Sequence, residues 1–600
     1  MVQAVGQAAH RDDGRLSLLI STAGGWLLAL VWMVALTPSI FASLSASGND
    51  DAMRLVQVRD LLQGQPWFDL TQHRLGPAEG TPMHWSRLVD LPIAVLILLS
   101  RPLVGAAAAE AVAATLWPLL LIGPLVLGLA ASARALGQRG ADFAAALLAA
   151  GLAFTSFKFQ PGALDHHNLQ LVLLASSLAG VVLSRRRPGF GLLAGASLAA
   201  SLATGIEMLV QSAAIAAGMA CLWAWEGATA RRATLAFAAA LALALPLLFL
   251  ATAPAEAWSF AFCDALTLPL LLPATLGAAG LWLVAATLSA RPRRLRLLGL
   301  AALAALVGAT ALAASPACLA DPFAGIDPRL MQHWIAQVNE ARPIGTVLSD
   351  NPIAHLGSYA VPLLGLGAAV VFALRAAPAD RGLWVLLAVL LLLCAALAAY
   401  QVRTRAALEV VAILPLACLI AQPYARWRQT RARRDGLAAL TLLLLSLPMA
   451  WTLVLGSLFK GVEPRSSGTA AGLVHCLAPA YFAPLAALPP GRVAASSNLG
   501  AHILRFTDHR VLAAPYHRNQ AGLLTQLEIA LAPPPEAEDR LRAAAVDYLA
   551  FCLADPEYAG AGAPETRFFF ALQAGGDFVF LEPMETPPDS PLRLFRFRAP

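Results

Sequence analysis

Residues 48–90 read GNDDAMRLVQVRDLLQGQPWFDLTQHRLGPAEGTPMHWSRLVD, and they form a polar island in a chain that is otherwise apolar. The island follows the first long apolar run and holds three large aromatic residues, Trp67, Phe68 and Trp85. A loop that merely connects two membrane spans is also polar, but it does not need this aromatic content. We therefore interpret residues 48–90 as a functional loop rather than a plain connection. Its candidate functional side chains are carboxylates and imidazoles: Asp50, Asp51, Asp60, Asp69, His73, His84 and Asp90.

The composition indicates a polytopic α-helical membrane protein. Of the 600 residues, 58% are hydrophobic and only 13% are charged, whereas a soluble domain carries about 25% charged residues. The mean hydropathy is +0.66. The arginines occur in short clusters between apolar runs, which is typical of orientation in a lipid bilayer. The net charge of +6 therefore does not indicate a nucleic-acid partner.

About thirteen segments are long and apolar enough to be expected as membrane spans. Arginine clusters follow alternate segments, which predicts a cytoplasmic N-terminus and a transmembrane domain over residues 1–458. Residues 91–109 are apolar but interrupted by Arg101 and Pro102, so we expect a re-entrant or interfacial piece there. Glu409 lies inside a span, where a lone charge is costly, so we expect it to pair with a neighbour. The expected spans are 16–40, 111–133, 142–157, 168–184, 190–206, 208–225, 233–252, 268–290, 297–315, 357–375, 382–400, 406–422 and 437–458.

Residues 459–600 have the composition of a soluble domain. Strand and helix patterns alternate there, which predicts a small α/β domain on the same, extracytoplasmic side as residues 48–90. Strands are expected in GRVAASS, RVLAAPY, DYLAFCL, DFVFLE and LRLFRF, and helices near 499–506, 520–531 and 536–546. Cys476 and Cys552 could form a disulfide if this side is oxidising, although their spacing does not establish one.

Carboxylates, imidazoles and a cation recur in outer loops that lie far apart in the sequence. The second outer loop holds Asp165, His166 and His167, the fifth holds Glu340, and the sixth holds Arg403. Carboxylates and imidazoles from separate loops can converge on a divalent cation, and a basic side chain at a helix end suits an anionic ligand group. Two structural explanations stay open: Asp165 as a helix N-cap, and Arg403 as an interfacial cation.

The order of these features resembles the catalytic subunit of oligosaccharyltransferases, within the C-type (polytopic) glycosyltransferases. In that family the first loop carries an acid, a Trp-Phe pair and a Pro/Gly-rich turn, which DDAMR…WFDLTQHRLGPAEG resembles, with Asp51 at the acid. The second motif is Asp-X-Asp, or Asp-X-His in archaeal members, and Asp165 with His167 resembles the latter. The fifth-loop motif ends in Glu before a Pro, as in VNEARP with Glu340, and the family's phosphate-binding Arg matches Arg403. The resemblance covers roughly residues 16–458.

The resemblance implies a metal-assisted transfer reaction. Arg403 would bind the phosphate of the donor, and Asp51 would position or deprotonate the acceptor. A Mg²⁺ or Mn²⁺ ion would be surrounded by Asp51, Asp165, His167 and Glu340. Further candidates for the same site are Asp50, His84 and His166.

The function implied is transfer of a sugar or oligosaccharide from a polyprenyl-phosphate or -diphosphate donor to an extracytoplasmic acceptor, with inversion at the sugar carbon. The expected location is a bacterial plasma membrane. One departure concerns the acceptor, because the family recognises its sequon with a Trp-Trp-Asp motif in the C-terminal domain and every Trp here lies before residue 452. The acceptor therefore stays open among glycan, lipid and protein, and residues 516–519 are either structural contacts or part of its site. The rival class is a transporter or flippase of lipid-linked saccharides, for which paired inverted repeats would be expected.

Overall fold

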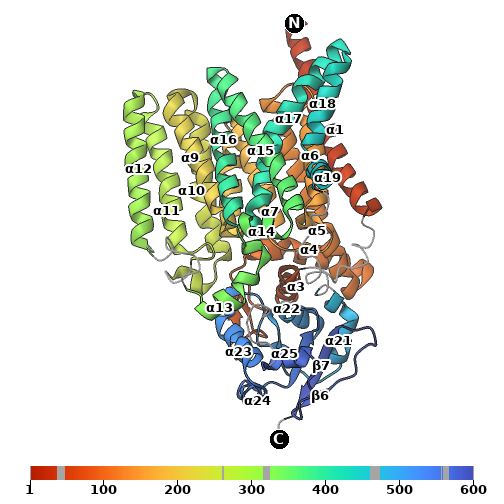
Figure 1. The fold of residues 1–600 in the computed structure, drawn as a ribbon. Helices are drawn as coiled ribbons and strands as arrows, with labels where there is room; N and C mark the ends of the chain where they lie inside the picture. The colour runs from red at the N-terminus through yellow and green to blue at the C-terminus, as the bar shows by residue number, and fades with distance from the viewer. Residues whose placement is uncertain are drawn as a thin grey trace.

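The computed structural model describes residues 2–36, 48–259, 263–314, 316, 325–459, 473, 475–555, 557 and 566–598, and the side chains of these residues except 2–13, 337 and 339. A bundle of α-helices forms one end of the molecule, and a smaller domain with a β-sheet forms the other (Figure 1). The N-terminus lies at the far end of the bundle, and the C-terminus lies at the far end of the small domain.

The bundle confirms the polytopic α-helical fold class. In the described part of the chain, ten helices are long and apolar enough to cross a membrane, and α18 with α19 qualifies as a bent pair. Two shorter apolar helices, α6 and α8, coincide with the third and fifth expected spans. The elements are α1 (Val2–Leu36), α5 (Ala106–Leu136), α6 (Ala141–Thr155), α7 (His167–Ser184), α8 (Phe190–Thr204), α9 (Leu209–Glu226), α10 (Arg231–Thr252), α11 (Leu268–Leu288), α12 (Arg293–Ala314), α15 (Pro352–Arg375), α16 (Pro378–Tyr400), α17 (Arg405–Thr430), α18 (Arg433–Leu445) and α19 (Pro448–Leu458).

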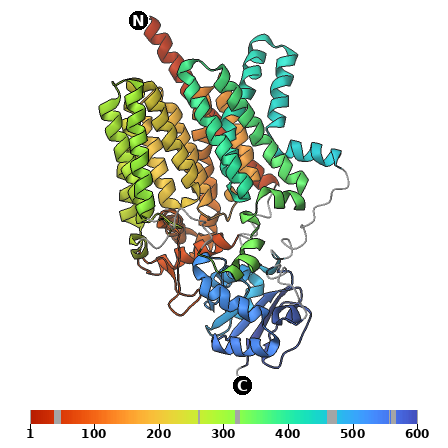
Figure 2. The same cartoon turned by 60° about the vertical axis from the view of Figure 1, so that its left-hand side comes forward.

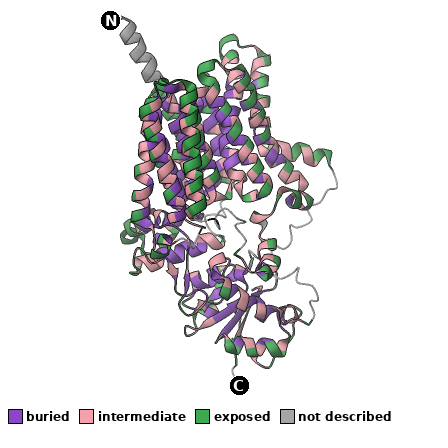
Figure 3. Cartoon of the chain, turned by 90° about the vertical axis from the view of Figure 1, so that its left-hand side faces the viewer, coloured by how far each residue is buried: buried purple, intermediate pink, exposed green. Residues whose placement is uncertain are grey.

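Small residues let these helices pack closely, as α8 and α10 illustrate. Gly191 and Gly195 are one helical turn apart on α8. A Cβ atom at either position would lie 2.3 Å from the Ala233 oxygen or 2.2 Å from the Phe237 oxygen of α10. Close backbone approach of this kind is how apolar helices associate where water provides no driving force. The buried residues accordingly lie inside the bundle and the exposed ones on its outside (Figure 3).

The last expected span differs from the prediction, because residues 437–458 form two helices rather than one. The axes of α18 and α19 meet at 82°. Pro448 begins α19, and the residue before it, Leu447, is extended with φ −109° and ψ 122°. A proline lacks an N–H and disfavours helical geometry in the residue before it, which explains the break. Figure 2 shows α19 turned away from the direction of the bundle.

The small domain contains all five expected strands. They are β3 (Arg492–Ala495), β4 (Arg510–Val511), β5 (Tyr548–Cys552), β6 (Leu581–Pro583) and β7 (Leu592–Phe597), in the sheet order β4-β3-β5-β7-β6. Pairing is parallel from β4 through β3 to β5 and antiparallel from β5 through β7 to β6. The surrounding helices are α21 (Pro479–Ala486), α22 (Ser497–Phe506), α23 (Gln520–Leu531), α24 (Pro534–Ala543) and α25 (Phe568–Gln573).

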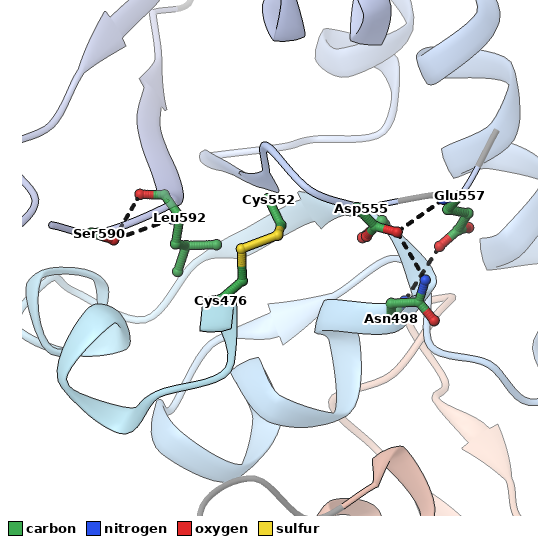
Figure 4. Close-up of a disulfide and its surroundings, with 8 residues drawn as sticks. Cys476, Asn498, Cys552, Asp555, Glu557, Ser590 and Leu592 are labelled. Carbon is green, nitrogen blue, oxygen red and sulfur yellow. Dashed lines mark hydrogen bonds between the residues drawn. A yellow bond between two sulfur atoms is a disulfide. The ribbon is translucent and has the colours of Figure 1, made fainter. Parts of the chain in front are cut away.

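A disulfide joins the start of this domain to its central strand, β5. The sequence had suggested this pair without establishing it. Cys476 and Cys552 are bonded, with their Cα atoms 5.9 Å apart (Figure 4). Both residues are buried in the core beneath α22. The bridge closes a loop of 76 residues, so it restricts the unfolded chain strongly.

The first loop is built into the small domain. It forms α3 (Asn49–Leu62), the short strands β1 (Thr71–Gln72) and β2 (Thr81–Pro82), and α4 (Arg87–Val104). The N–H of Val511 donates to the oxygen of Arg74 at 2.9 Å, and the N–H of Gly76 donates to the oxygen of Val511 at 2.8 Å, so the loop adds to the β4 edge of the sheet. Met53 and Trp85 share one hydrophobic core with the small domain.

A buried ion triad fixes the internal geometry of this loop. Asp90 accepts from Arg54 at 2.8 Å on one oxygen and from Arg87 at 3.0 Å on the other. All three side chains are almost completely buried. Because removing one member would strand a buried charge, the triad holds the start of α4 against α3. Residues 91–109 were expected to form a re-entrant or interfacial piece. Residues 91–104 belong to α4, which lies at the bundle end nearest the small domain (Figure 1), and residues 106–109 begin α5.

Candidate active site

The first carboxylates of the candidate site lie at the start of α3, where Asp51 joins the first loop to the loop that precedes α7. One oxygen of Asp51 accepts the backbone N–H groups of Leu164 and Asp165, at 2.7 and 2.9 Å. Its other oxygen accepts the N–H of Gly48 at 2.9 Å, which caps α3. Asp51 therefore positions the loop that carries Asp165 directly beside the first turn of α3.

A single lysine connects the second outer loop to Glu340. Lys158, in the 3-10 turn η2 (Phe157–Phe159), places its Nζ atom 3.8 Å from a carboxylate oxygen of Asp165 and 3.8 Å from one of Glu340. Glu340 lies in η8 (Asn339–Ala341) and is 48% exposed, whereas Asp165 is only 9% exposed. The charge of Glu340 also acts on Asp50. We call the four carboxylates around Lys158 the acid cluster: Asp50, Asp51, Asp165 and Glu340.

The turn of Arg403 packs against the turn of Glu340. Arg403 lies in η9 (Val402–Thr404), and the N–H of Val402 donates to the oxygen of Arg342 at 3.2 Å. The Nε of Arg403 donates to Gln401 at 3.0 Å. The structure thus brings the predicted phosphate-binding cation to the region of the acid cluster.

The predicted pairing of Glu409 is confirmed. Its carboxylate lies 3.0 Å from Arg405, one helical turn earlier on α17. This contact compensates a charge that would otherwise be buried alone among apolar helices.

His166, a candidate from the sequence, and Glu207, for which no role was predicted from the sequence, extend a chain of charged groups from Asp165. His166 places Nδ1 2.7 Å from Asp165 and Nε2 3.0 Å from Glu207, which lies in η3 (Ile206–Met208) at the start of α9. Glu207 also accepts from Gln170 at 2.8 Å. The sequence contained one indication of this role for Glu207: it is an acid at the start of an apolar span, where an ionisable residue needs a partner.

His167 lies on the other side of Asp165. Its Nε2 atom is 3.4 Å from the second carboxylate oxygen. In the described part of the chain, potential ligand atoms of Asp165, His166 and His167 lie within 4.8 Å of one another. Asp51 and Glu340 border this group, the first through a hydrogen bond to the Asp165 backbone and the second through Lys158.

Negative charge is concentrated in the acid cluster. Burial, and then repulsion from Asp165 and Glu340, raise the pKa of Asp50 to about 7. Burial, and then repulsion from Asp165, raise the pKa of Asp51 to about 6. Burial disfavours a charged His166, but the adjacent carboxylates outweigh it and raise the pKa of that imidazole to about 10. The four carboxylates face two cations, Lys158 and the His166 imidazolium, and the remaining excess of negative charge suits a further cation.

His84 lies apart from the acid cluster. Its ring is 4.8 Å from that of His517, which contacts Asp264 in the loop between α10 and α11. Trp85, the next residue in the chain, lies between His84 and the acid cluster. Its ring centroid is 6.4 Å from that of His166 and 5.3 Å from that of Tyr516. The Tyr516 hydroxyl donates to the backbone oxygen of Asn49 at 3.0 Å. Residues 516–519, whose role the sequence left undecided, therefore border the acid cluster.

Comparison with solved structures shows which fold this is. The archaeal oligosaccharyltransferase AglB from Archaeoglobus fulgidus, in complex with an inhibitory peptide and a dolichol-phosphate, is 13% identical with a TM-score of 0.62, over 90% of this chain and 70% of that one. The same enzyme tethered to an acceptor peptide is 14% identical with a TM-score of 0.62, over 90% and 71% of the two chains. Its complex with Zn and sulfate is 14% identical with a TM-score of 0.54, over 84% and 64%.

The chain therefore has the fold of C-type (GT-C) membrane glycosyltransferases, as its motif order had suggested. At this identity the likeness concerns the fold. No protein-family model and no curated protein matches the sequence.

Proposed function

We propose that this protein is a membrane glycosyltransferase that moves a sugar or oligosaccharide from a polyprenyl-phosphate or -diphosphate donor to an extracytoplasmic acceptor, with inversion. The observation that carries the proposal is the convergence of Asp51, Asp165 and Glu340, from three distant segments, at the bundle end that faces the small domain. The GT-C fold supports it. The prenyl tail would lie among the spans, with the phosphate and sugar at this end.

A divalent ion such as Mg²⁺ or Mn²⁺ fits the residues present. Asp165, His167 and Glu340 offer carboxylate and imidazole ligands, and burial, followed by repulsion from Asp165 and Glu340, raises the pKa of Asp50 beside them. When bound, the ion would neutralise charge that develops on the leaving phosphate. Lys158 lies between Asp165 and Glu340 and would contribute a second positive charge.

The other residues of the site have distinct proposed roles. Arg403 binds the donor phosphate as a fixed cation. Asp51, whose oxygens already accept backbone N–H groups, positions the Asp165 loop. Asp51, or Asp50 beside it in the first turn of α3, would position the acceptor or take its proton. Direct displacement by the acceptor would invert the sugar carbon.

The proposed orientation has the N-terminus in the cytoplasm and the small domain outside a bacterial plasma membrane. The turns at the bundle end away from the small domain carry the arginine clusters, for example 185–187 between α7 and α8 and 431–434 between α17 and α18. Clusters of this kind mark the cytoplasmic side. Reporter fusions after Arg187 and after Pro600 should read cytoplasmic and external, respectively.

The function can be tested with purified protein in nanodiscs or vesicles, Mn²⁺, and polyprenyl-linked donors that carry a labelled sugar. Envelope glycans and glycoproteins, compared by mass spectrometry with and without the protein, identify the acceptor to supply. The proposal expects label on the acceptor, free polyprenyl phosphate or diphosphate, and the opposite anomeric configuration. Label that crosses a vesicle membrane while it stays attached to the lipid would contradict it and indicate a flippase.

A further inference from the structure

A second group of ligating side chains lies where the bundle meets the small domain. His84 belongs to the first loop, Asp264 to the loop between α10 and α11, and His517 to the 3-10 turn η10 (His517–Asn519) of the small domain. One potential ligand atom from each lies within 4.8 Å of those from the other two. We call these three residues the histidine cluster.

The contacts within the histidine cluster are short and already ordered. The Nε2 atom of His517 is 2.6 Å from one oxygen of Asp264. Arg518 holds the same carboxylate with both arms of its guanidinium group, at 2.7 and 2.6 Å. A ligating carboxylate is commonly held by such a neighbour, which fixes the direction of its free lone pairs.

His84 supplies the second observation, an unsatisfied nitrogen. Its Nδ1 atom is buried and has no hydrogen-bond partner in the described part of the chain. A neutral imidazole offers a lone pair, and a buried polar atom without a partner is rare in folded proteins.

We propose that the histidine cluster binds a zinc ion that joins the first loop, the α10–α11 loop and the small domain. Two imidazoles and one carboxylate form a borderline ligand set that zinc prefers, with a fourth position left for water. Zinc takes the place of the proton shared between His517 and Asp264. The contact between those two ligand atoms then widens from 2.6 Å to about 3.3 Å, as tetrahedral ligands at about 2 Å require.

This zinc ion has a structural role that does not depend on the proposed transfer reaction. His84 and His517 are the immediate neighbours of Trp85 and Tyr516, whose rings pack against each other beside the acid cluster. An ion that ties His84 to His517 therefore fixes the small domain on the first loop. Trp85 and His166 separate the ion from the acid cluster.

The test measures zinc directly in the full-length protein, purified through a tag that contains no histidine. The neighbouring candidate metal site is first disabled by Asp165→Asn with His167→Asn, so that Asp165 and His167 do not bind the metal. After a chelator wash, the protein is equilibrated with buffered zinc, and bound metal is counted by mass spectrometry. Cobalt is substituted in parallel, because its visible absorption reports tetrahedral nitrogen and oxygen ligation.

We expect one zinc ion per chain in this background and at least a tenfold weaker affinity after His84→Ala or His517→Gln. His73→Ala, which removes an exposed histidine of the same loop, is the control that keeps the zinc. His517→Gln preserves a polar side chain and guards against a simple folding failure of His84→Ala. No bound zinc, or equal zinc in all of these variants, would overturn the proposal and leave only an ion pair of Asp264 with His517 and Arg518.

Discussion

The acid cluster and the histidine cluster lie at the same junction and are assembled in the same way, yet their chemistry differs. Each takes residues from segments that are far apart in the sequence, and Trp85 lies between the two clusters. The acid cluster is rich in oxygen and sets four carboxylates against Lys158. In the histidine cluster a single carboxylate, Asp264, is already matched by Arg518.

This difference in composition suits the acid cluster to the proposed transfer reaction and the histidine cluster to a structural metal ion. Unbalanced carboxylates favour a hard, exchangeable cation, and such a cation would in turn bind the phosphate of a lipid-linked donor. Nitrogen ligands around one satisfied carboxylate favour zinc. The two clusters should therefore respond differently to substitution.

The largest expected effect is the loss of the acid cluster itself. Asp165→Ala and Glu340→Ala should each lower sugar transfer by at least about 100-fold, because each removes a ligand of the proposed cation that would neutralise the leaving phosphate. Transfer is measured with labelled donor, and folding by size-exclusion chromatography. Glu79→Ala, an exposed acid of the first loop, is the matched control. Near-normal transfer by Asp165→Ala would remove the acid cluster from the mechanism.

Arg403 should affect the donor rather than the ion. Arg403→Ala should raise the KM for donor by about 10- to 100-fold, because a hydrogen bond to a charged group contributes about 1.5–3 kcal/mol. The affinity for Mn²⁺ should stay unchanged, and Arg403→Lys should recover part of the loss. An unchanged KM for both variants would make Arg403 an interfacial residue only.

Glu207 should act through His166. Glu207→Gln weakens the hold on His166, which contacts Asp165, so Mn²⁺ affinity should fall by about 10- to 100-fold, as for other residues that orient a ligand. The KM for donor at saturating Mn²⁺ should change little. Glu256→Gln, an exposed carboxylate at the same end, is the control. Equal Mn²⁺ affinity in both variants would limit Glu207 to a structural contact.

The smallest expected effect is the pH dependence of stability in the absence of divalent cations. Asp50 has a pKa of about 7 in the folded protein against 3.8 for an unperturbed carboxyl, so the folded state binds its proton more tightly. Its contribution to stability is therefore greatest at low pH and declines as the pH rises from about 4 to 7. Asp50→Asn should raise the unfolding temperature relative to the wild type more at about pH 8 than at about pH 5. Parallel pH profiles of the two proteins, followed by fluorescence, would contradict the assigned environment of Asp50.

Much of the fold can be predicted from local sequence, because a long apolar run indicates a membrane-spanning helix and alternation of apolar and polar residues indicates a strand. Each of the expected spans and all five strands correspond to elements of the structure. The break before Pro448 has a local cause too, but hydropathy averages over it. The addition of the first loop to β4 is different, since it joins Arg74 to Val511 across more than 400 residues and leaves no periodic trace in either segment.

The site shows the same division. The motifs around Asp51, Asp165, Glu340 and Arg403 were visible because each lies in a polar segment between apolar runs and resembles a motif of one family in the expected order. The partnership of His166 with Glu207 was not visible, because it depends on how α7 and α9 pack. The same holds for His84, whose neighbours Asp264 and His517 come from two other segments. Residue type gave the candidate ligands, and only tertiary structure sorted them into two clusters.

The most direct test of the central claim is a structure of the protein with Mn²⁺ and a non-hydrolysable polyprenyl-phosphate sugar analogue. We expect anomalous scattering from manganese between Asp165, His167 and Glu340, with the phosphate of the analogue in contact with Arg403. Manganese elsewhere, or an analogue whose phosphate lies away from the acid cluster, would contradict the assignment of this cluster as the site of sugar transfer.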